Sequence, residues 1–239
     1  MKIGIITDIH SNIYALNSVI NEFNKIKVDK IICCGDIIGI GANPEEVVQG
    51  LIQIKDKLII VKGNHEQYLL NGLPKEIHDD KRKMSADEIK NHEWNQNNLS
   101  EVSKKFIRTF KITETIQIEN KKIHVVHYPF DESGKYKKYI KKPTVEENEK
   151  MFQGVEADIF VYGHTHTISV NNKNDKWYIN CGTLGCPMKT NIANARILEI
   201  NGDKVESEQL KVEYDVSSAI AEIEKLKYPF YKEILRIFY

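Results

Sequence analysis

Short apolar runs divide the chain, and each is followed at once by polar residues or glycine. A run of about four to eight apolar residues is short for a helix and too continuous for a half-exposed strand, so it predicts a strand buried on both faces. The most informative run extends from Leu58 to Val61 and ends at Lys62 and Gly63. The runs cover residues 2–7, 30–34, 58–61, 123–126 and 159–162.

Helical patterns separate the first three runs. Apolar residues recur at helical spacing after residue 12, and Asn43-Pro44-Glu45-Glu46 has the cap, proline and acids typical of a helix start. The alternation of strand and helix predicts a parallel, layered sheet and an α/β fold. For Asn12 two interpretations stay open, a helix N-cap and a contact to a substrate phosphate.

Residues from about 71 to 111 are polar and show a helical pattern without strands. Leu99, Val102, Phe106 and Phe110 fit one helical stripe, which predicts an inserted helical pair packed over the sheet edge. We expect Trp94 in its core, and His78 and His92 as ordinary surface or semi-buried histidines. Because the insertion follows His65 directly, it is also a candidate lid.

Strand patterns return after the insertion, and the chain closes with helices. Hairpins are predicted over 114–126 and 169–180, two further strands over 195–200 and 204–212, and one or two amphipathic helices over about 216–238. With 239 residues and no internal repeat, the sequence predicts a single domain over 1–239 that carries the helical insertion.

Polar donors follow each of the five apolar runs. A single Asp-x-His or Gly-Asp match is common by chance and usually marks a turn or a cap. The set is more specific, because ligands of open α/β sheets bind beyond the carboxyl ends of the strands. We therefore expect one site, made by residues at these ends: Asp8, His10, Asp36, Asn64, His65, Glu66, His127, His164 and His166.

Seven of these residues are oxygen or imidazole donors suited to a transition metal. Imidazole with carboxylate favours Mn, Fe, Ni, Zn or Co over Ca, with Mn the favoured ion here, and seven donors are too many for one tetrahedral zinc. Two ions about 3.5–4 Å apart that share a carboxylate use such a set, and they hold a bridging hydroxide for attack on phosphorus. The seven donors are Asp8, His10, Asp36, Asn64, His127, His164 and His166.

The order of motifs resembles that of the calcineurin-like metallophosphoesterases, and in particular their small bacterial and archaeal phosphodiesterases. It consists of Asp8-x-His10, Gly35-Asp36, Gly63-Asn64-His65-Glu66, His127 and Gly163-His164-x-His166, with the turn Cys181-Gly182-Thr183-Leu184-Gly185 after them. The resemblance implies a four-layer α/β/β/α sandwich. It also implies that Asp8, His10 and His166 hold one ion, that Asn64, His127 and His164 hold the other, and that Asp36 lies between them.

The same resemblance assigns His65 to catalysis. It implies that His65 binds no metal and protonates the leaving oxygen or stabilises its charge, with Glu66 or Asp36 orienting it. Asp36 is the second expected catalytic residue, and Asn12, Asn64 and His65 are the expected substrate contacts. Gly182 and Thr183 correspond to the turn that borders the family's site.

Three departures from the family pattern narrow the substrate. The Asp-Arg pair of the family's protein phosphatases is replaced by residues 37–41, Ile-Ile-Gly-Ile-Gly, which argues against a phosphoprotein. Tyr128 stands where small members usually have glycine after the metal-binding histidine. Arginines are few, four in all, and no arginine clamp for a phosphate monoester can be identified among them. The lysine and tyrosine tract 135–142 is either a solvated loop or a patch that attracts a polyanion.

Composition restricts the partners. The 34 basic and 34 acidic residues give zero net charge, so we expect neither duplex nucleic acid nor an anionic membrane as partner. No signal peptide or membrane-length apolar run is present, which predicts a cytoplasmic protein.

The cysteines lack zinc-site spacing, so we interpret them as reduced, buried small hydrophobes, with Cys181 closest to the site. They are Cys33, Cys34, Cys181 and Cys186.

These observations favour a dinuclear-metal phosphoesterase. The expected reaction is hydrolysis of a phosphodiester or nucleotide phosphoanhydride, and the expected partner is a small phosphorylated substrate such as a nucleotide or dinucleotide. The alternatives are a phosphomonoesterase of the same fold and a non-enzymatic metal-binding interaction scaffold. A missing ligand or a lost His65 would favour the scaffold, and the sequence retains all seven donors and His65.

Overall fold

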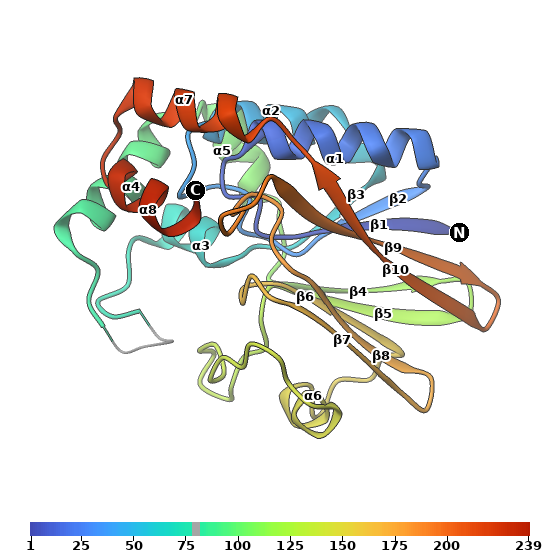
Figure 1. Ribbon diagram of the computed structural model, residues 1–239. Helices are drawn as coiled ribbons and strands as arrows, with labels where there is room; N and C mark the ends of the chain where they lie inside the picture. Colours follow the sequence, from blue (N-terminus) through green and yellow to red (C-terminus); the bar gives the residue numbers. More distant parts are fainter. Residues whose placement is uncertain (78–81) are drawn as a thin grey trace.

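Two five-stranded sheets lie face to face between two helical layers in the computed structural model, which describes residues 1–77 and 82–239 (Figure 1). Helices α1 (Ile13–Ile26), α2 (Pro44–Gln53), α5 (Glu101–Arg108) and α7 (Val216–Leu226) cover the first sheet, and α6 (Val145–Met151) lies on the far side of the second. This arrangement confirms the α/β/β/α sandwich. None of the described helices combines the length and apolar character that crossing a membrane requires.

The first sheet has the order β10-β9-β1-β2-β3. Its strands β1, β2 and β3 run parallel, because α1 and α2 return the chain to the same end of the sheet each time. Strands β9 and β10 form an antiparallel hairpin beside β1. The bounds are β1 (Lys2–Ile6), β2 (Lys30–Cys33), β3 (Leu58–Ile60), β9 (Ile192–Asn201) and β10 (Lys204–Glu213).

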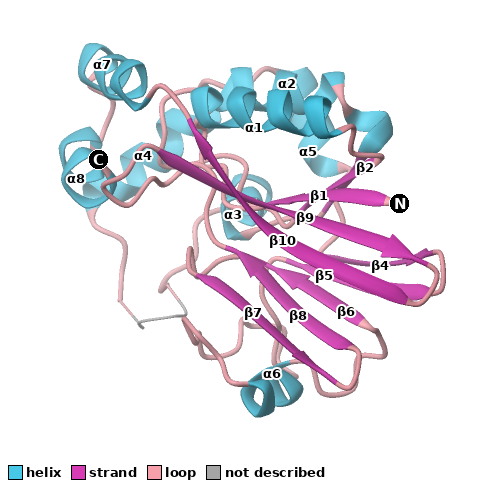
Figure 2. Cartoon of the chain, turned by 45° about the vertical axis from the view of Figure 1, so that its right-hand side comes forward, coloured by secondary structure: helices cyan, strands magenta, loops and turns pink. Residues whose placement is uncertain are grey.

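The second sheet has the order β4-β5-β6-β8-β7, with parallel strands β5, β6 and β8 in its centre and antiparallel strands at both edges. Figure 2 shows the two sheets stacked with the helices outside them. The bounds are β4 (Thr113–Ile118), β5 (Lys121–Val126), β6 (Ile159–Tyr162), β7 (Ile168–Lys173) and β8 (Lys176–Cys181).

Three apolar cores hold the layers together. The first lies between the outer helices and the first sheet, and Phe23 is completely buried in it. The second fills the space between the sheets with side chains such as Ile5 and Val161. The third packs Phe152 of the α6 end against Phe160 of β6. Central strands thus contact a core on each face, which explains why their sequences are continuously apolar.

Strand β3 differs from its prediction. Leu58, Ile59 and Ile60 are only half-buried, because β3 is the edge strand and pairs only with β2 along its length. The expectation of a strand buried on both faces was therefore wrong for this run. Val61, immediately after it, is fully buried and forms a parallel bridge to Lys111.

The segment predicted as an insertion is helical, but its helices do not form a single pair over the sheet edge. It comprises the end of α3 (Asn64–Asn71), α4 (Ala86–Asn97) and α5, and α5 packs against α2 in the outer helical layer. Leu99 and Phe110 are buried, whereas Val102 is 64% exposed and does not belong to the predicted stripe. The expectation for His78 lies outside the described residues.

Two helices close the chain, as predicted. Helix α7 is followed by a turn and α8 (Tyr231–Phe238), which returns the C-terminus to the side of α4. The ring of Trp94 on α4 stacks on Tyr228 with ring centroids 4.7 Å apart, which places Trp94 in a small apolar cluster with α8. The carboxyl-terminal helices therefore form part of the wall around the strand ends.

Candidate metal centre

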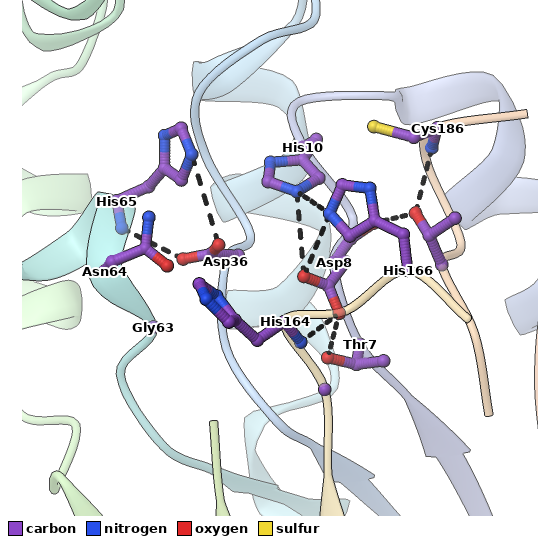
Figure 3. A network of polar contacts seen from close by, with 12 residues as sticks. Thr7, Asp8, His10, Asp36, Gly63, Asn64, His65, His164, His166 and Cys186 are labelled. Carbon is purple, nitrogen blue, oxygen red and sulfur yellow. Dashed lines mark hydrogen bonds and ion pairs between the residues drawn. The ribbon is translucent and has the colours of Figure 1, made fainter. Parts of the chain in front are cut away.

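All seven predicted metal donors meet at one end of the two sheets. Figure 3 labels all of them except His127. Asp8 and His10 follow β1, Asp36 follows β2, and Asn64 begins α3 just after β3. The second sheet supplies the other three, which follow β5 and β6: His127, His164 and His166. The parallel strands bring these distant segments to the same edge, as the sequence predicted.

The first group consists of Asp8, His10 and His166. The Nε2 atoms of the two imidazoles lie 2.9 Å apart, and Asp8 Oδ1 lies 3.3 Å from His166 Nε2 and 3.7 Å from His10 Nε2. His10 Nδ1 faces the carbonyl of Ile38 at 3.4 Å, so this nitrogen carries the proton and leaves the Nε2 lone pair directed at the group.

The second group consists of Asn64, His127 and His164. His127 Nε2 lies 3.2 Å from Asn64 Oδ1 and 3.1 Å from His164 Nδ1. His127 Nδ1 donates to the carbonyl oxygen of Cys34 at 2.8 Å, so the Nε2 lone pair of this fully buried ring also faces the group. An imidazole fixed in this tautomer by a backbone carbonyl is the usual form of a metal ligand.

Asp36 lies between the two groups. Its Oδ2 is 3.2 Å from His127 Nε2, and its Oδ1 accepts a hydrogen bond from the backbone N–H of His65 at 2.9 Å. Among the described residues, Asp36 belongs both to a candidate metal-binding cluster with His127 and His164 and to one with His10 and His65. This is the position that a carboxylate shared by two ions requires.

The unsatisfied atoms of the site fit a divalent cation. Asp8 Oδ2 accepts from the Thr7 hydroxyl at 2.6 Å and from the backbone N–H of His164 at 3.0 Å, whereas the buried Oδ1 accepts no hydrogen bond from any described residue. A buried carboxylate oxygen without a partner costs free energy unless a cation lies beside it. Carboxylate, amide and imidazole donors together suit divalent transition ions.

The charges of the site also favour a cation. Burial alone lowers the pKa of His127, but the adjacent Asp36 carboxylate raises it to about 9. Burial also works to lower the pKa of His166, but Cys186 and Asp8 raise it well above its ordinary value. Burial works to raise the pKa of Asp36, and the neighbouring His127 and His65 hold it far below its ordinary value. The site therefore has a negative potential that stabilises positive charge.

The backbone at these positions is held in a sparsely populated conformation. Five of the seven donors have a positive φ, although none of them is glycine. Such residues cost about 1–3 kcal/mol each and persist where the surrounding structure holds them for a function. The φ values are 53° for Asp8, 45° for His10, 51° for Asp36, 71° for His164 and 53° for His166.

His65 lies beside the donors without belonging to either ligand group of the prediction. Its Nε2 is 4.0 Å from Asp36 Oδ2, and its ring centroid is 5.0 Å from that of His10. Its Nδ1 makes no hydrogen bond to any described residue. Burial lowers the pKa of His65 well below its ordinary value, so the ring is neutral at pH 7.

Glu66 does not orient the His65 ring, which was one of the two roles expected from the family. Its carboxylate accepts backbone N–H groups of Gly63 at 2.7 Å, Asp36 at 2.9 Å and Ile37 at 3.0 Å. Burial is the main cause, and the negative charge of Asp36 the second, of a pKa of Glu66 raised to about 7. Glu66 thus ties the loop after β2 to the start of α3 and positions Asp36.

Asn12 is a helix cap. Its Oδ1 accepts from the backbone N–H of Ala15 at 3.0 Å, and its Nδ2 donates to the carbonyl of Gly185 at 3.0 Å and to the Tyr239 hydroxyl at 3.2 Å. The side chain is 2% exposed and its polar atoms are used within the protein. These bonds support the interpretation of Asn12 as a helix cap, and the contact to a substrate phosphate stays a prediction.

Sequence reasoning missed three residues near the centre. Cys186 clusters with His10 and His166 among the described metal-donor groups, and its thiol hydrogen-bonds with His166. The His92 ring lies 5.0 Å from that of His65, and Tyr136 stacks on His164 with centroids 5.3 Å apart. For Cys186 the glycine turn just before it was a usable signal. His92 and Tyr136 lie on separate segments, and only the tertiary packing brings them here.

Comparison with known proteins agrees with this geometry. Residues 1–203 match the calcineurin-like phosphoesterase superfamily domain. An uncharacterized protein of Methanocaldococcus jannaschii is 31% identical, over 95% of this chain and 93% of its own. The solved structure of a hypothetical protein from Pyrococcus horikoshii has a TM-score of 0.83 at 16% identity and covers 100% of this chain and 97% of its own.

A metallophosphoesterase from Sphaerobacter thermophilus has the same fold, with a TM-score of 0.73 at 19% identity and coverage of 100% of this chain and 98% of its own. The domain match includes all seven donors and His65, because it extends from residue 1 to residue 203. The chain therefore belongs to the calcineurin-like phosphoesterase superfamily.

Proposed function

We propose that this protein is a phosphodiesterase that uses two divalent transition-metal ions. The observation that carries the proposal is the position of Asp36, between two groups of donors and 4.0 Å from the Nε2 atom of a further histidine, His65. Asp8, His10 and His166 would hold one ion, Asn64, His127 and His164 the other, and Asp36 both. When bound, such ions neutralise charge on the phosphoryl oxygens and activate water. Manganese remains the favoured ion.

The protein's own contribution lies in His65. Because burial keeps this ring neutral, its free N–H can donate a hydrogen bond to the oxygen that leaves phosphorus and carries developing negative charge. The backbone N–H of His65 donates to Asp36 Oδ1, which fixes the start of α3 relative to the metal donors. Asp36 is therefore both the shared ligand and the residue that positions His65.

A diester is favoured over a monoester because the arginines nearest the centre are already paired with carboxylates. Arg82 pairs with Glu88 and Arg236 with Glu233, each at 2.7 Å. A terminal phosphate monoester usually requires such cations for its second negative charge. A solved archaeal phosphodiesterase shares the fold, with a TM-score of 0.52 at 20% identity and coverage of 88% of this chain and 100% of its own, which supports the same reaction class.

The nucleotide substrate expected from the sequence stays a proposal. Within the 135–142 tract, its expected contact is now a tyrosine and not a lysine. Lys137 of the 135–142 tract donates to the carbonyls of Lys150 and Met151 at the end of α6, at 3.2 and 2.7 Å. This argues against the view that Lys137 meets extra phosphates. Tyr136 and Tyr139 are members of the tract that reach the centre: Tyr136 stacks on His164, and Tyr139 lies edge-on to the same ring.

The test is hydrolysis of bis(4-nitrophenyl) phosphate by the purified protein after chelation and after return of Mn, Zn, Co, Ni or Fe(II) ions. We expect activity that requires metal, with 4-nitrophenyl phosphate a poorer substrate. A preference for the monoester would support the phosphomonoesterase alternative. Metal binding without hydrolysis of either compound would support the scaffold. The four free, buried cysteines agree with the cytoplasmic location, which likewise stays a prediction.

A further inference from the structure

A cavity of about 460 Å³ opens beside His65. Its walls come from α3, α4 and α8, so the closing helix of the chain contributes directly to the surroundings of the active site. Asn64 and His65 form the end nearest the metal centre. A volume of this size is within the range of about 300–1,000 Å³ that small-molecule sites occupy.

The charges in this cavity are paired. Arg82 makes two hydrogen bonds to Glu88, at 2.8 and 2.7 Å, and Arg236 pairs with Glu233 at 2.7 Å. Both pairs line the cavity. Each arginine is thus already neutralised by a carboxylate, so these pairs offer no net positive charge to a second phosphate.

The remaining surface is apolar and rich in rings. His92 lies edge-on to Tyr68, with ring centroids 5.4 Å apart, and both line the cavity together with Phe230, Phe238 and Ile237. Burial lowers the pKa of His92, so this ring is neutral as well. Flat, uncharged groups pack favourably on such a surface by stacking and by loss of apolar area to water.

A second, smaller cavity of about 200 Å³ lies on the other side of Asn64 and Tyr68. Tyr136 and His164 line it, and Lys135 is the one lysine among the described residues that do so. Several hollows thus border the donors: one beside His65, one beside His164, and one of about 380 Å³ that is lined by His164 and His166. A phosphodiester, with two organic groups on one phosphorus, can use more than one of them, whereas a monoester needs only one.

We infer that the larger cavity binds the departing alcohol of the substrate, and that this alcohol is uncharged and carries a ring, as a nucleoside or an aryl alcohol does. The inference rests on the proposed phosphodiesterase function and on the place of His65 at the mouth of the cavity. In the reaction the bond between phosphorus and the departing oxygen breaks. Water supplies the oxygen atom that replaces it on phosphorus. In the net reaction, one proton of that water ends on the departing alcohol.

Ile237 allows a direct test, since it lines the cavity and is 40% exposed, so that its replacement need not disturb folding. Binding of adenosine and of 4-nitrobenzyl alcohol, neither of which contains phosphate, is measured by calorimetry on the metal-loaded protein. Leu226→Glu on α7 is the matched control, because Leu226 is 45% exposed and is not among the residues lining the cavity.

We expect both alcohols to bind the wild-type protein and to compete with bis(4-nitrophenyl) phosphate. Ile237→Glu should raise their Kd about tenfold or more, because it places an unpaired charge against an apolar ring, and Ile237→Ala should raise it less. Leu226→Glu should leave it unchanged. The Ki of inorganic phosphate, which binds at the metals, should not change in any variant.

Absence of binding by both alcohols, or an equal Kd in wild type and Ile237→Glu, would overturn the inference while leaving the phosphodiesterase proposal intact. Failure of the proposed function gives a different result, namely no hydrolysis of any diester with any metal, whatever the alcohols do. A change in the phosphate Ki that parallels the alcohol Kd would also count against the inference, because it would assign the effect of Ile237→Glu to the metal centre.

Discussion

His10 Nε2 and His166 Nε2 lie 2.9 Å apart, with the buried Asp8 Oδ1 facing both. Since His10 Nδ1 faces a carbonyl, its Nε2 presents a lone pair, and His166 lies where the same cation would be bound. Two imidazoles and a carboxylate that converge in this way are stable together when a cation joins them. The fold thus holds these three side chains together before a cation binds, with positive φ at both Asp8 and His10.

Cys186 should influence this group through His166. The thiol hydrogen-bonds with His166, and burial raises the pKa of the thiol, so Cys186 acts as an orienting partner in its protonated form. Cys186→Ala should weaken metal binding about ten- to a hundredfold, the usual effect of losing such a partner. Cys186→Ser should restore much of the affinity. Titration with Zn²⁺ against a chromophoric chelator measures this, and equal affinity in wild type and Cys186→Ala would show that Cys186 has no such role.

His65→Ala should retain both metals and slow turnover by about 10²–10⁴ on substrates with a poor leaving group. The loss should be smaller on nitrophenyl esters, because nitrophenol leaves without help. Metal analysis and kcat on the two substrate classes give the comparison, with His164→Ala as the control that does lose metal. If metal content falls in both variants alike, His65 is a ligand and the assignment is wrong.

Gly39 positions the His65 ring. A Cβ atom at Gly39 would collide with His65 Nδ1, and the glycine has a φ of +83°. Gly39→Ala should therefore reproduce most of the kinetic defect of His65→Ala without loss of metal. Gly154→Ala separates this from backbone strain, since Gly154 has a φ of +85° and a Cβ atom there would meet no described neighbour within 4 Å. Similar kcat values in the two glycine variants would contradict the positioning role.

Glu88 links stability to pH through Arg82. Hydrogen bonds from Arg82 lower the pKa of Glu88 to about 2 from its ordinary 4.5. Burial acts in the opposite direction but is the smaller effect. A carboxyl whose pKa is depressed on folding stabilises the protein above its unfolded pKa, and this contribution is lost as the pH falls through the folded value.

The difference in the free energy of unfolding between wild type and Glu88→Gln should accordingly be constant above about pH 5 and shrink as the pH falls from about 4.5 to 2. Because the pair is partly exposed, we expect a difference of about 1 kcal/mol or less. Urea unfolding at several pH values and low salt measures it. A difference that grows toward acid pH would contradict this assignment.

The sequence was sufficient to predict most of the strands and the meeting of their polar ends, because both depend on local signals. Apolar runs identify strands, and parallel topology brings their carboxyl ends together, so residues such as Asp36 and His164 could be placed in one site without coordinates. The four layers came from the family resemblance. Helical character over about 71–111 and 216–238 followed from the sequence pattern, whereas the separate helices 86–97, 216–226 and 231–238 are seen only in the structure.

Features that depend on long-range packing could not be predicted. The edge position of β3 follows from the order of strands in the sheet, which the apolar run from Leu58 to Val61 does not reveal. The proximity of His92 to His65 requires α4 to lie against α3, and the cavity requires α8 to return beside both. Lys137 was predicted from its charge, but its position over the end of α6 depends on the folding of the whole tract.

The most direct test of the metal centre is elemental analysis of wild type and Asp36→Asn, purified without oxygen or chelator and reloaded with Mn²⁺ or Zn²⁺. We expect about two ions per wild-type chain, as in other two-metal hydrolases. Asp36→Asn should lose metal and activity more completely than His10→Ala or His164→Ala, because its charge serves both ions. Wild-type protein that binds no transition metal and hydrolyses diesters equally well in the presence of chelator would contradict the account.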